Sequence, residues 1–236
     1  MRTYSVQPVP GCPAGRSDTK VDLVLAAAYL LPFILLIAFI GRIDTRFVLF
    51  VLWGCIAAVP AYFLEPVLAS ALQAEIPAAI ASLTISPLIE EFFMALPLLI
   101  LALAGTRRKD REIFFCAMAS GIGFAIIENG LLASADPFVV LIHSFSTALL
   151  HGCTCGIIGY GIVIAGHFDR RAFAALVFGF FTLAVTVHAI YNTLGTAFFG
   201  AAGICIDLVF PLLLFFLLLA CYHIAPVALL THSADG

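Results

Sequence analysis

Residues 84–104 read TISPLIEEFFMALPLLILALA, an apolar run that carries two adjacent glutamates near its start. About 20 predominantly apolar residues are enough to cross the hydrocarbon core of a bilayer as a helix. A carboxylate held near the bilayer centre costs roughly 2.5–3.5 kcal/mol on insertion scales, so Glu90 and Glu91 require polar partners or a bound cation. The stretch therefore predicts a membrane-spanning helix with polar chemistry inside it.

The rest of the chain has the same character. Its 236 residues are 63% hydrophobic and only 11% charged, with a mean hydropathy of +1.15 and a net charge of -3. Soluble domains are about half apolar and about a quarter charged. This composition excludes a soluble enzyme and a disordered chain, and the lack of a basic stripe argues against a nucleic-acid partner. Long unbroken apolar runs favour helices over a transmembrane barrel.

The sequence predicts an all-α, polytopic transmembrane helix bundle of about seven spans. Residues 1–20 are expected to form a flexible tail, residues 21–225 one transmembrane domain, and residues 226–236 a short C-terminal tail. Residues 65–83 are interrupted by Glu65, Gln73, Glu75 and Pro77, so we interpret them as interfacial or re-entrant, with an eighth span if they cross. The predicted spans are 21–40, 47–64, 84–104, 113–133, 138–165, 172–194 and 201–224.

Basic residues are distributed unevenly over this pattern. With seven spans, one side of the membrane holds eight lysines and arginines, and the other holds three, all in the N-terminal tail. Cytoplasmic loops carry an excess of these residues, so the N-terminus is expected outside and the C-terminus inside. If residues 65–83 cross the membrane, nine lysines and arginines lie on one side and two on the other, and the N-terminus is expected inside.

Ionisable side chains inside the spans are the candidates for chemistry. With a rise of 1.5 Å per residue, four of them fall about 7–10 Å from span ends at one membrane face, and His151 lies about 20 Å from the start of its span. The four are Glu90, Glu128, His188 and Asp207. Two imidazoles with one or two carboxylates match the composition of a catalytic zinc site, which has three protein ligands and one open position. Interhelical hydrogen bonds are the alternative for each residue taken alone.

Helical spacing refines these candidates. Residues four apart share a helix face, which pairs Thr147 with His151 and His188 with Asn192. Gly123 and Gly121 precede Glu128 by about one and two turns, where small residues allow neighbouring helices to approach closely.

Four motifs resemble those of the PrsW family of intramembrane metalloproteases. Residues 89–91 (IEE) resemble its diglutamate motif, residues 123–129 (GFAIIEN) its GFAxxEN motif, residues 143–151 (HSFSTALLH) its histidine motif, and residues 188–192 (HAIYN) its HxxxN motif. All four lie within residues 84–195, in the family's order. The more distant CPBP family, which includes the CAAX-prenyl endopeptidases, carries FxxxH where this chain has Phe124 and Glu128. Two positions depart from the PrsW pattern, since Met94 and His143 stand where basic residues are usual.

The resemblance implies an intramembrane zinc-dependent endopeptidase. Glu128, His151 and His188 would hold the metal. Either Glu90 or Glu91, with Glu91 preferred, would act as the general base, and Asn192 would donate a hydrogen bond to the oxyanion.

The resemblance also implies a partner and a location. The substrate would be a membrane-anchored protein, such as an anti-sigma factor, cut within the lipid bilayer near the outer face of a bacterial cell membrane. A proteolytically inactive scaffold, or a transporter with a buried polar relay, is the alternative from a different functional class.

Overall fold

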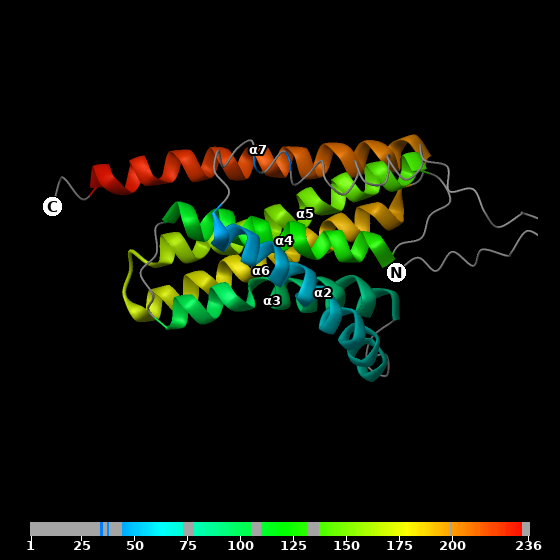
Figure 1. Ribbon diagram of the computed structural model, residues 1–236, viewed down its shortest axis with the longest axis horizontal. Helices are drawn as coiled ribbons and strands as arrows, with labels where there is room; N and C mark the ends of the chain where they lie inside the picture. The colour runs from blue at the N-terminus through cyan, green and yellow to red at the C-terminus, as the bar shows by residue number, and fades with distance from the viewer. Residues whose placement is uncertain are drawn as a thin grey trace, which may run out of the picture.

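The computed structural model describes residues 44–72, 78–104, 110–131, 137–198 and 200–232, together with Ile34 and Ile37. Every element of regular structure in these residues is a helix, and all six helices are long and apolar enough to cross a membrane. The predicted all-α class is therefore confirmed. The helices are α2 (Thr45–Leu72), α3 (Ala78–Leu103), α4 (Asp110–Leu131), α5 (Pro137–Ala165), α6 (Arg170–Ala197) and α7 (Gly200–His232), as Figure 1 shows.

The interpretation of residues 65–83 as a segment of their own is wrong for the part that the structure describes. Residues 65–72 continue α2, and residues 78–83 begin α3, so they form neither an interfacial segment nor an eighth span. The sequence suggested a separate segment because Glu65, Gln73, Glu75 and Pro77 interrupt the apolar run. A membrane helix tolerates a proline where neighbouring groups satisfy the freed carbonyl, and α2 contains two, Pro60 and Pro66.

Two other predicted segments lie at the ends of the chain. The predicted first span, residues 21–40, and the predicted N-terminal tail fall outside the described residues, apart from Ile34 and Ile37. At the other end α7 continues to His232, so most of the predicted C-terminal tail is helical. Its apolar stretch from Val227 to Leu230 continues the helix because leucine and alanine favour helical backbone.

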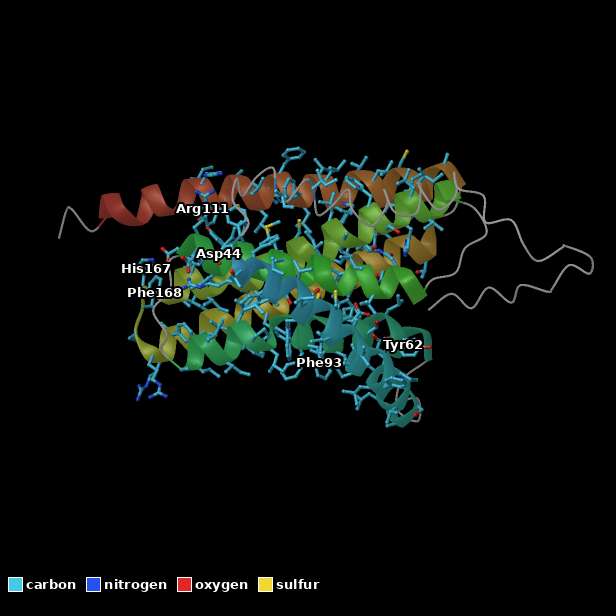
Figure 2. All side chains as sticks on the ribbon, in the orientation of Figure 1. Asp44, Tyr62, Phe93, Arg111, His167 and Phe168 are labelled. Carbon is cyan, nitrogen blue, oxygen red and sulfur yellow. The ribbon has the colours of Figure 1, made fainter. Side chains whose placement is uncertain are left out.

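Consecutive helices run antiparallel, so the connections alternate between the two ends of the bundle (Figure 1). Every described lysine and arginine lies at the end that also holds the C-terminal end of α7: Arg46, Arg111, Arg170 and Arg171. We call this the basic end, and Figure 2 shows Arg111, Asp44 and His167 there. The positive-inside rule predicts that the basic end faces the cytoplasm.

The helix α5 lies at the centre of the bundle. Inside the structure, 89% of its candidate span is buried, compared with 11% for α6 and 22% for α7. The outer helices therefore present most of their apolar side chains to lipid, and polar side chains on α5 are shielded from it. Any intramembrane chemistry that involves α5 takes place in the interior of the protein.

Glycines allow α4 to pack against both α5 and α2 with backbone in contact. A Cβ added at Gly121 would overlap the carbonyl group of His151, and one added at Gly123 would overlap that of Val51. On the facing side, a Cβ at Gly54 would overlap the Ser120 carbonyl. The predicted close approach at Gly121 and Gly123 is thus confirmed, and it brings α4 directly beside the backbone of His151.

Replacing Gly121 by alanine is expected to destabilise the bundle by about 1–3 kcal/mol, because the added methyl forces α4 away from α5. Activity should fall as well, since the same shift separates Glu128 from His151. The measurement is thermal unfolding in detergent. Gly130→Ala is the matched control, because a Cβ at Gly130 meets nothing within 4 Å. Equal stability of the two variants would contradict this account of the packing.

A hydrogen bond from α2 compensates for a proline in α3. Pro97 has no N–H to donate to the carbonyl of Phe93, four residues earlier in the helix. The indole Nε1–H of Trp53 donates to that carbonyl instead, over 2.9 Å. Ser120 Oγ donates to the neighbouring carbonyl of Met94 over 2.8 Å. These bonds attach α3 to α2 and α4 just after the diglutamate.

Candidate active site

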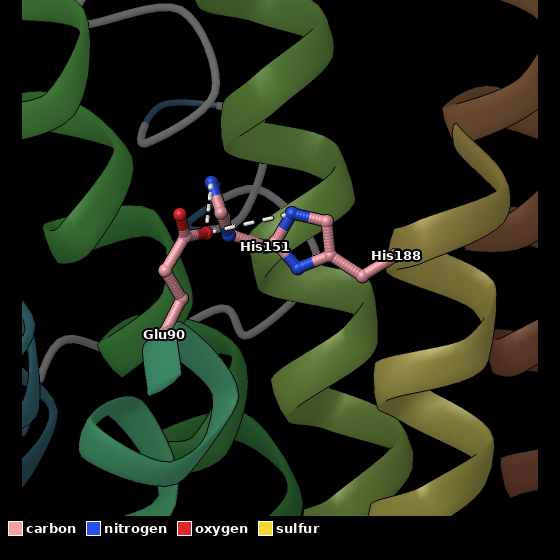
Figure 3. Close-up of side chains that lie close together, drawn as sticks. All are labelled: Glu90, His151 and His188. Atoms are coloured by element: carbon pink, nitrogen blue, oxygen red, sulfur yellow. Dashed lines mark ion pairs between the residues drawn. The ribbon is translucent and has the colours of Figure 1, made fainter. Parts of the chain in front are cut away.

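Three side chains that are distant in sequence converge in the interior of the bundle (Figure 3). Glu90 comes from α3, His151 from α5 and His188 from α6. Glu90 Oε2 lies 3.5 Å from His188 Nε2 and 3.9 Å from His151 Nε2. The two imidazole rings meet edge to face, with centroids 4.8 Å apart. We call Glu90, His151 and His188 the central cluster.

Two further glutamates contact the histidines of the central cluster. Glu128, on α4, places its Oε2 2.7 Å from His151 Nε2. Glu91 Oε1 lies 2.9 Å from His188 Nδ1, on the side of the ring that faces away from Glu90. A carboxylate on Nδ1 holds an imidazole in the tautomer whose Nε2 is free to accept a metal. Glu91 therefore orients His188, while Nε2 faces the cluster.

The sequence-predicted depth of His151 needs one correction. Its position suggested a site deeper than the other candidates, yet the structure brings its ring into contact with Glu128, near the end of α4. The depths were estimated by counting residues from the span ends, which assumes that the helices lie parallel and have equal length. In the structure α5 crosses its neighbours at an angle (Figure 1), so depth along one helix does not translate directly into depth along another.

The cluster is shielded on nearly all sides. Exposed fractions are 5% for Glu90, 0% for Glu91, 1% for His151 and 2% for His188. The Glu128 side chain is 33% exposed, which makes it the accessible edge of the site. Glu128 is also three residues from the end of α4 that lies opposite the basic end. Among these residues, Glu128 therefore marks the least buried side of the site.

The donor set of the central cluster fits a metal ion such as zinc. One ligand atom from each of the three residues lies within 4.8 Å of the others. Ligand atoms around a tetrahedral zinc ion are about 3.3 Å apart, given bonds of about 2.0–2.2 Å, so a small contraction would complete the site. Glu90 Oε2 is buried and makes no hydrogen bond to a described residue, as expected of a group that a cation would satisfy.

Local contacts hold the glutamates in place. Ser86 Oγ donates to Glu90 Oε1 over 2.6 Å, which leaves Oε2 to face the histidines. On the other wall, Thr147 Oγ1 lies 2.9 Å from Asn129 Oδ1, so the residue after Glu128 is bonded to the residue one turn before His151. The first contact orients the Glu90 carboxylate on its own helix α3, and the second ties the end of α4 beside Glu128 to the central α5.

Other predicted residues stand outside the central cluster. Asn192 is half-buried, one turn after His188, and none of its side-chain hydrogen bonds reaches a described residue of the cluster. His143 is half-buried, and its carbonyl accepts from Thr147. The Asp207 carboxylate accepts a hydrogen bond from Tyr191 instead of joining the metal-ligand group.

One residue near the site was missed from the sequence. Glu65 appeared only as an interruption of an apolar run, but it lies within α2 and its carboxyl is close enough to interact with Glu90. Glu128 also interacts with Glu90. The sequence did contain a signal for Glu65, namely a carboxylate in an apolar run. Burying a carboxylate in the membrane costs free energy, so such residues are commonly functional.

Comparison with known families tests this picture. The profile of the PrsW family of intramembrane metalloproteases matches residues 45–221, from the first turn of α2 to the last part of α7. The chain belongs to the PrsW family. Comparisons with curated proteins and with solved structures gave no match.

Membership establishes two coarse properties of the chain. As a PrsW protein with six apolar helices in the described residues, it is an integral, multi-pass membrane protein. The family is one of metalloproteases, and the buried Glu/His/His group lies within the matched residues. The matched region thus includes every element that builds the site.

Proposed function

We propose that this chain is a zinc-dependent intramembrane endopeptidase that cuts a membrane-anchored protein near the outer membrane face. The observation that carries the proposal is the central cluster, in which two imidazole nitrogens and an unpartnered carboxylate oxygen converge inside the bundle. Two nitrogen ligands and one carboxylate oxygen are typical of catalytic zinc sites, which keep a fourth position open.

Charge balance supports a cation at this position. Glu90, Glu91 and Glu128 surround two imidazoles, and Glu65 approaches from α2. Several carboxylates in a low-dielectric interior repel one another and lose hydration, which disfavours the metal-free ionised cluster. A divalent cation would offset that repulsion, so the excess of acidic groups favours metal binding over a set of purely structural hydrogen bonds.

Each residue then has a distinct role. His151, His188 and Glu90 would hold zinc, which when bound supplies Lewis-acid polarisation of the scissile carbonyl and activation of water. Glu91 keeps the His188 ring in the orientation that presents Nε2. Glu128, the most exposed of the acidic groups, is placed to accept a proton from the attacking water and return it to the leaving amine.

This assignment changes three roles that the resemblance implied, because Glu90 becomes the carboxylate ligand, Glu128 the general base and Glu91 the residue that orients His188. The sequence placed Glu128 among the ligands and preferred Glu91 as the general base. Burial and contacts favour this assignment, because Glu91 is fully buried behind His188 while Glu128 stands at the accessible edge. Asn192 remains the candidate for binding the oxyanion, one turn from His188 on the same helix face.

The substrate class follows from the location of the site. A peptide bond reaches buried groups between membrane-spanning helices only if its chain is itself held in the membrane. Glu128 lies about 4.5 Å along the helix axis from the end of α4, on the side away from the basic end. A membrane-anchored protein, such as an anti-sigma factor, cut just below the outer face would meet this requirement.

The test combines metal analysis with a search for cleavage products. Purified protein should contain about one zinc per chain by elemental mass spectrometry. Membrane vesicles containing the protein and native single-pass proteins should gain new N-termini, mapped by peptide mass spectrometry, within spans and close to one face. The chelator 1,10-phenanthroline should suppress them, and added zinc should restore them. Protein without metal and vesicles without new termini would instead favour the inactive scaffold.

A further inference from the structure

The helix that carries His188, α6, has few fully buried side chains. Only Ala184, His188 and Tyr191 are buried along the whole of α6. They are spaced four and three residues apart, so they lie along one line on the helix surface. The remaining surface of α6 is half-buried or exposed, and its packing includes Phe180, whose ring contacts Tyr160 of α5 with centroids 5.8 Å apart.

Rotation of α6 would directly affect His188. An imidazole carried about 6 Å from the helix axis moves by about 1 Å when the helix turns by 10°. Metal-ligand distances must be met to within about 0.2 Å. A specific contact must therefore hold the rotation of α6 if His188 is to bind an ion with useful affinity.

A buried hydrogen-bond network provides that contact. The Tyr191 hydroxyl lies 2.5 Å from Ser146 Oγ on α5, and Ser146 Oγ donates to the backbone carbonyl of Asp207 on α7 over 2.5 Å. The Tyr191 hydroxyl is also 3.4 Å from Asp207 Oδ1. Ser146 is 0% exposed and Tyr191 5% exposed, so water does not compete for these bonds. We call these three residues the Tyr191 network.

The network links the two helices that carry the histidines. Tyr191 is three residues after His188 on α6, and Ser146 is five residues before His151 on α5. Glu91 holds the His188 ring from the α3 side, whereas the Tyr191 network holds the helix backbone from the side of α5 and α7. Two anchors on opposite sides of α6 define both its rotation and the place of its imidazole.

We propose that Tyr191 is a positioning residue that sets the place of His188 through its hydrogen bonds to Ser146 and Asp207. The inference rests on the proposed function in so far as His188 is taken as a zinc ligand. It assigns a role to an acidic residue, Asp207, and to a tyrosine that the metal cluster itself does not use.

A second tyrosine provides a matched control. Tyr160 lies on α5, and its hydroxyl donates to the backbone carbonyl of Cys221 on α7 over 3.2 Å. This bond is of the same chemical kind, but Tyr160 is nine residues beyond His151, about 13 Å away along the helix. Loss of the Tyr160 hydroxyl should cost stability without affecting the cluster.

The experiment compares Tyr191→Phe with Tyr160→Phe. In Tyr191→Phe, zinc affinity measured by chelator competition should fall about 10–100-fold, the loss typical of groups that orient metal ligands. The value of kcat should fall with it, while KM changes less than about twofold. Tyr160→Phe should keep wild-type zinc affinity and kcat. If Tyr191→Phe fails to fold, Ser146→Ala removes the bond between Ser146 and Tyr191 with a smaller change and is judged by the same criteria.

A readout on metal-free protein separates this inference from the proposed function. In [15N]histidine-labelled protein, the ring signals of His188, identified by their absence in His188→Asn, should shift in Tyr191→Phe and stay in place in Tyr160→Phe. Equal His188 signals in the two tyrosine variants would overturn the positioning role. A wild-type protein that neither binds zinc nor cleaves would end the proposed function, and the ring signals would still decide the role of Tyr191.

Discussion

Replacing His188 by alanine is expected to abolish cleavage and remove the bound zinc, while the helices remain inserted in the membrane. The ring is 2% exposed and its Nε2 faces both Glu90 and His151, so no water or neighbouring side chain can take its place. We expect at least about a 1,000-fold loss of cleavage, equivalent to about 4 kcal/mol of transition-state stabilisation. His151→Ala should behave in the same way.

Controls separate loss of the metal from loss of the fold. His188→Asn retains a polar side chain beside the buried Glu91 carboxylate, so it tests metal binding with less damage to packing. His167→Ala removes a side chain that is 54% exposed, at the basic end, and should leave activity unchanged. Protease activity retained in both His151→Ala and His188→Ala would rule out the metalloprotease mechanism.

The second large effect distinguishes the three glutamates at the site. Glu128→Gln is expected to keep zinc and lose cleavage by about 100-fold or more, because the amide cannot accept the proton from water. Glu90→Gln should lose both the bound zinc and the cleavage activity, since Glu90 supplies the carboxylate of the metal-ligand group. Zinc content and cleavage rates of the purified variants provide the measurement.

Glu91→Gln completes this comparison. If Glu91 orients His188, zinc affinity should fall about 10–100-fold, and excess zinc should restore cleavage. If Glu91→Gln held zinc normally and did not cleave, Glu91 would be the general base, as the sequence suggested. Loss of zinc in Glu128→Gln would return Glu128 to the ligand set. Each variant therefore decides one role.

Most of the helices could be predicted from apolar runs alone. The runs at 84–104, 138–165 and 172–194 correspond to α3, α5 and α6, because a bilayer sets a minimum length for any helix that crosses it. The errors occur where a polar residue interrupts a run. Glu65 suggested an end to a helix that in fact continues to Leu72.

The site was predictable as a set of candidates but not as an arrangement. The cost of burying charge in lipid selects seven candidates from one sequence: Glu90, Glu91, Glu128, Asp207, His143, His151 and His188. Adjacent glutamates point about 100° apart on a helix, and the sequence does not indicate which one faces the histidines. The structure places Glu90 in the central cluster and Glu91 on the far nitrogen of His188.

By itself the sequence determined that this protein is a bundle of membrane helices with acidic and imidazole groups inside it. Hydropathy and the cost of buried charge are properties of short segments, so they can be evaluated without knowledge of the fold. Tertiary structure alone decided which groups meet, because Glu91 and His188 are 97 residues apart and their contact depends on helix tilt and rotation. Tilt and rotation arise from packing, such as the glycine contacts of α4 and the Tyr191 network of α6.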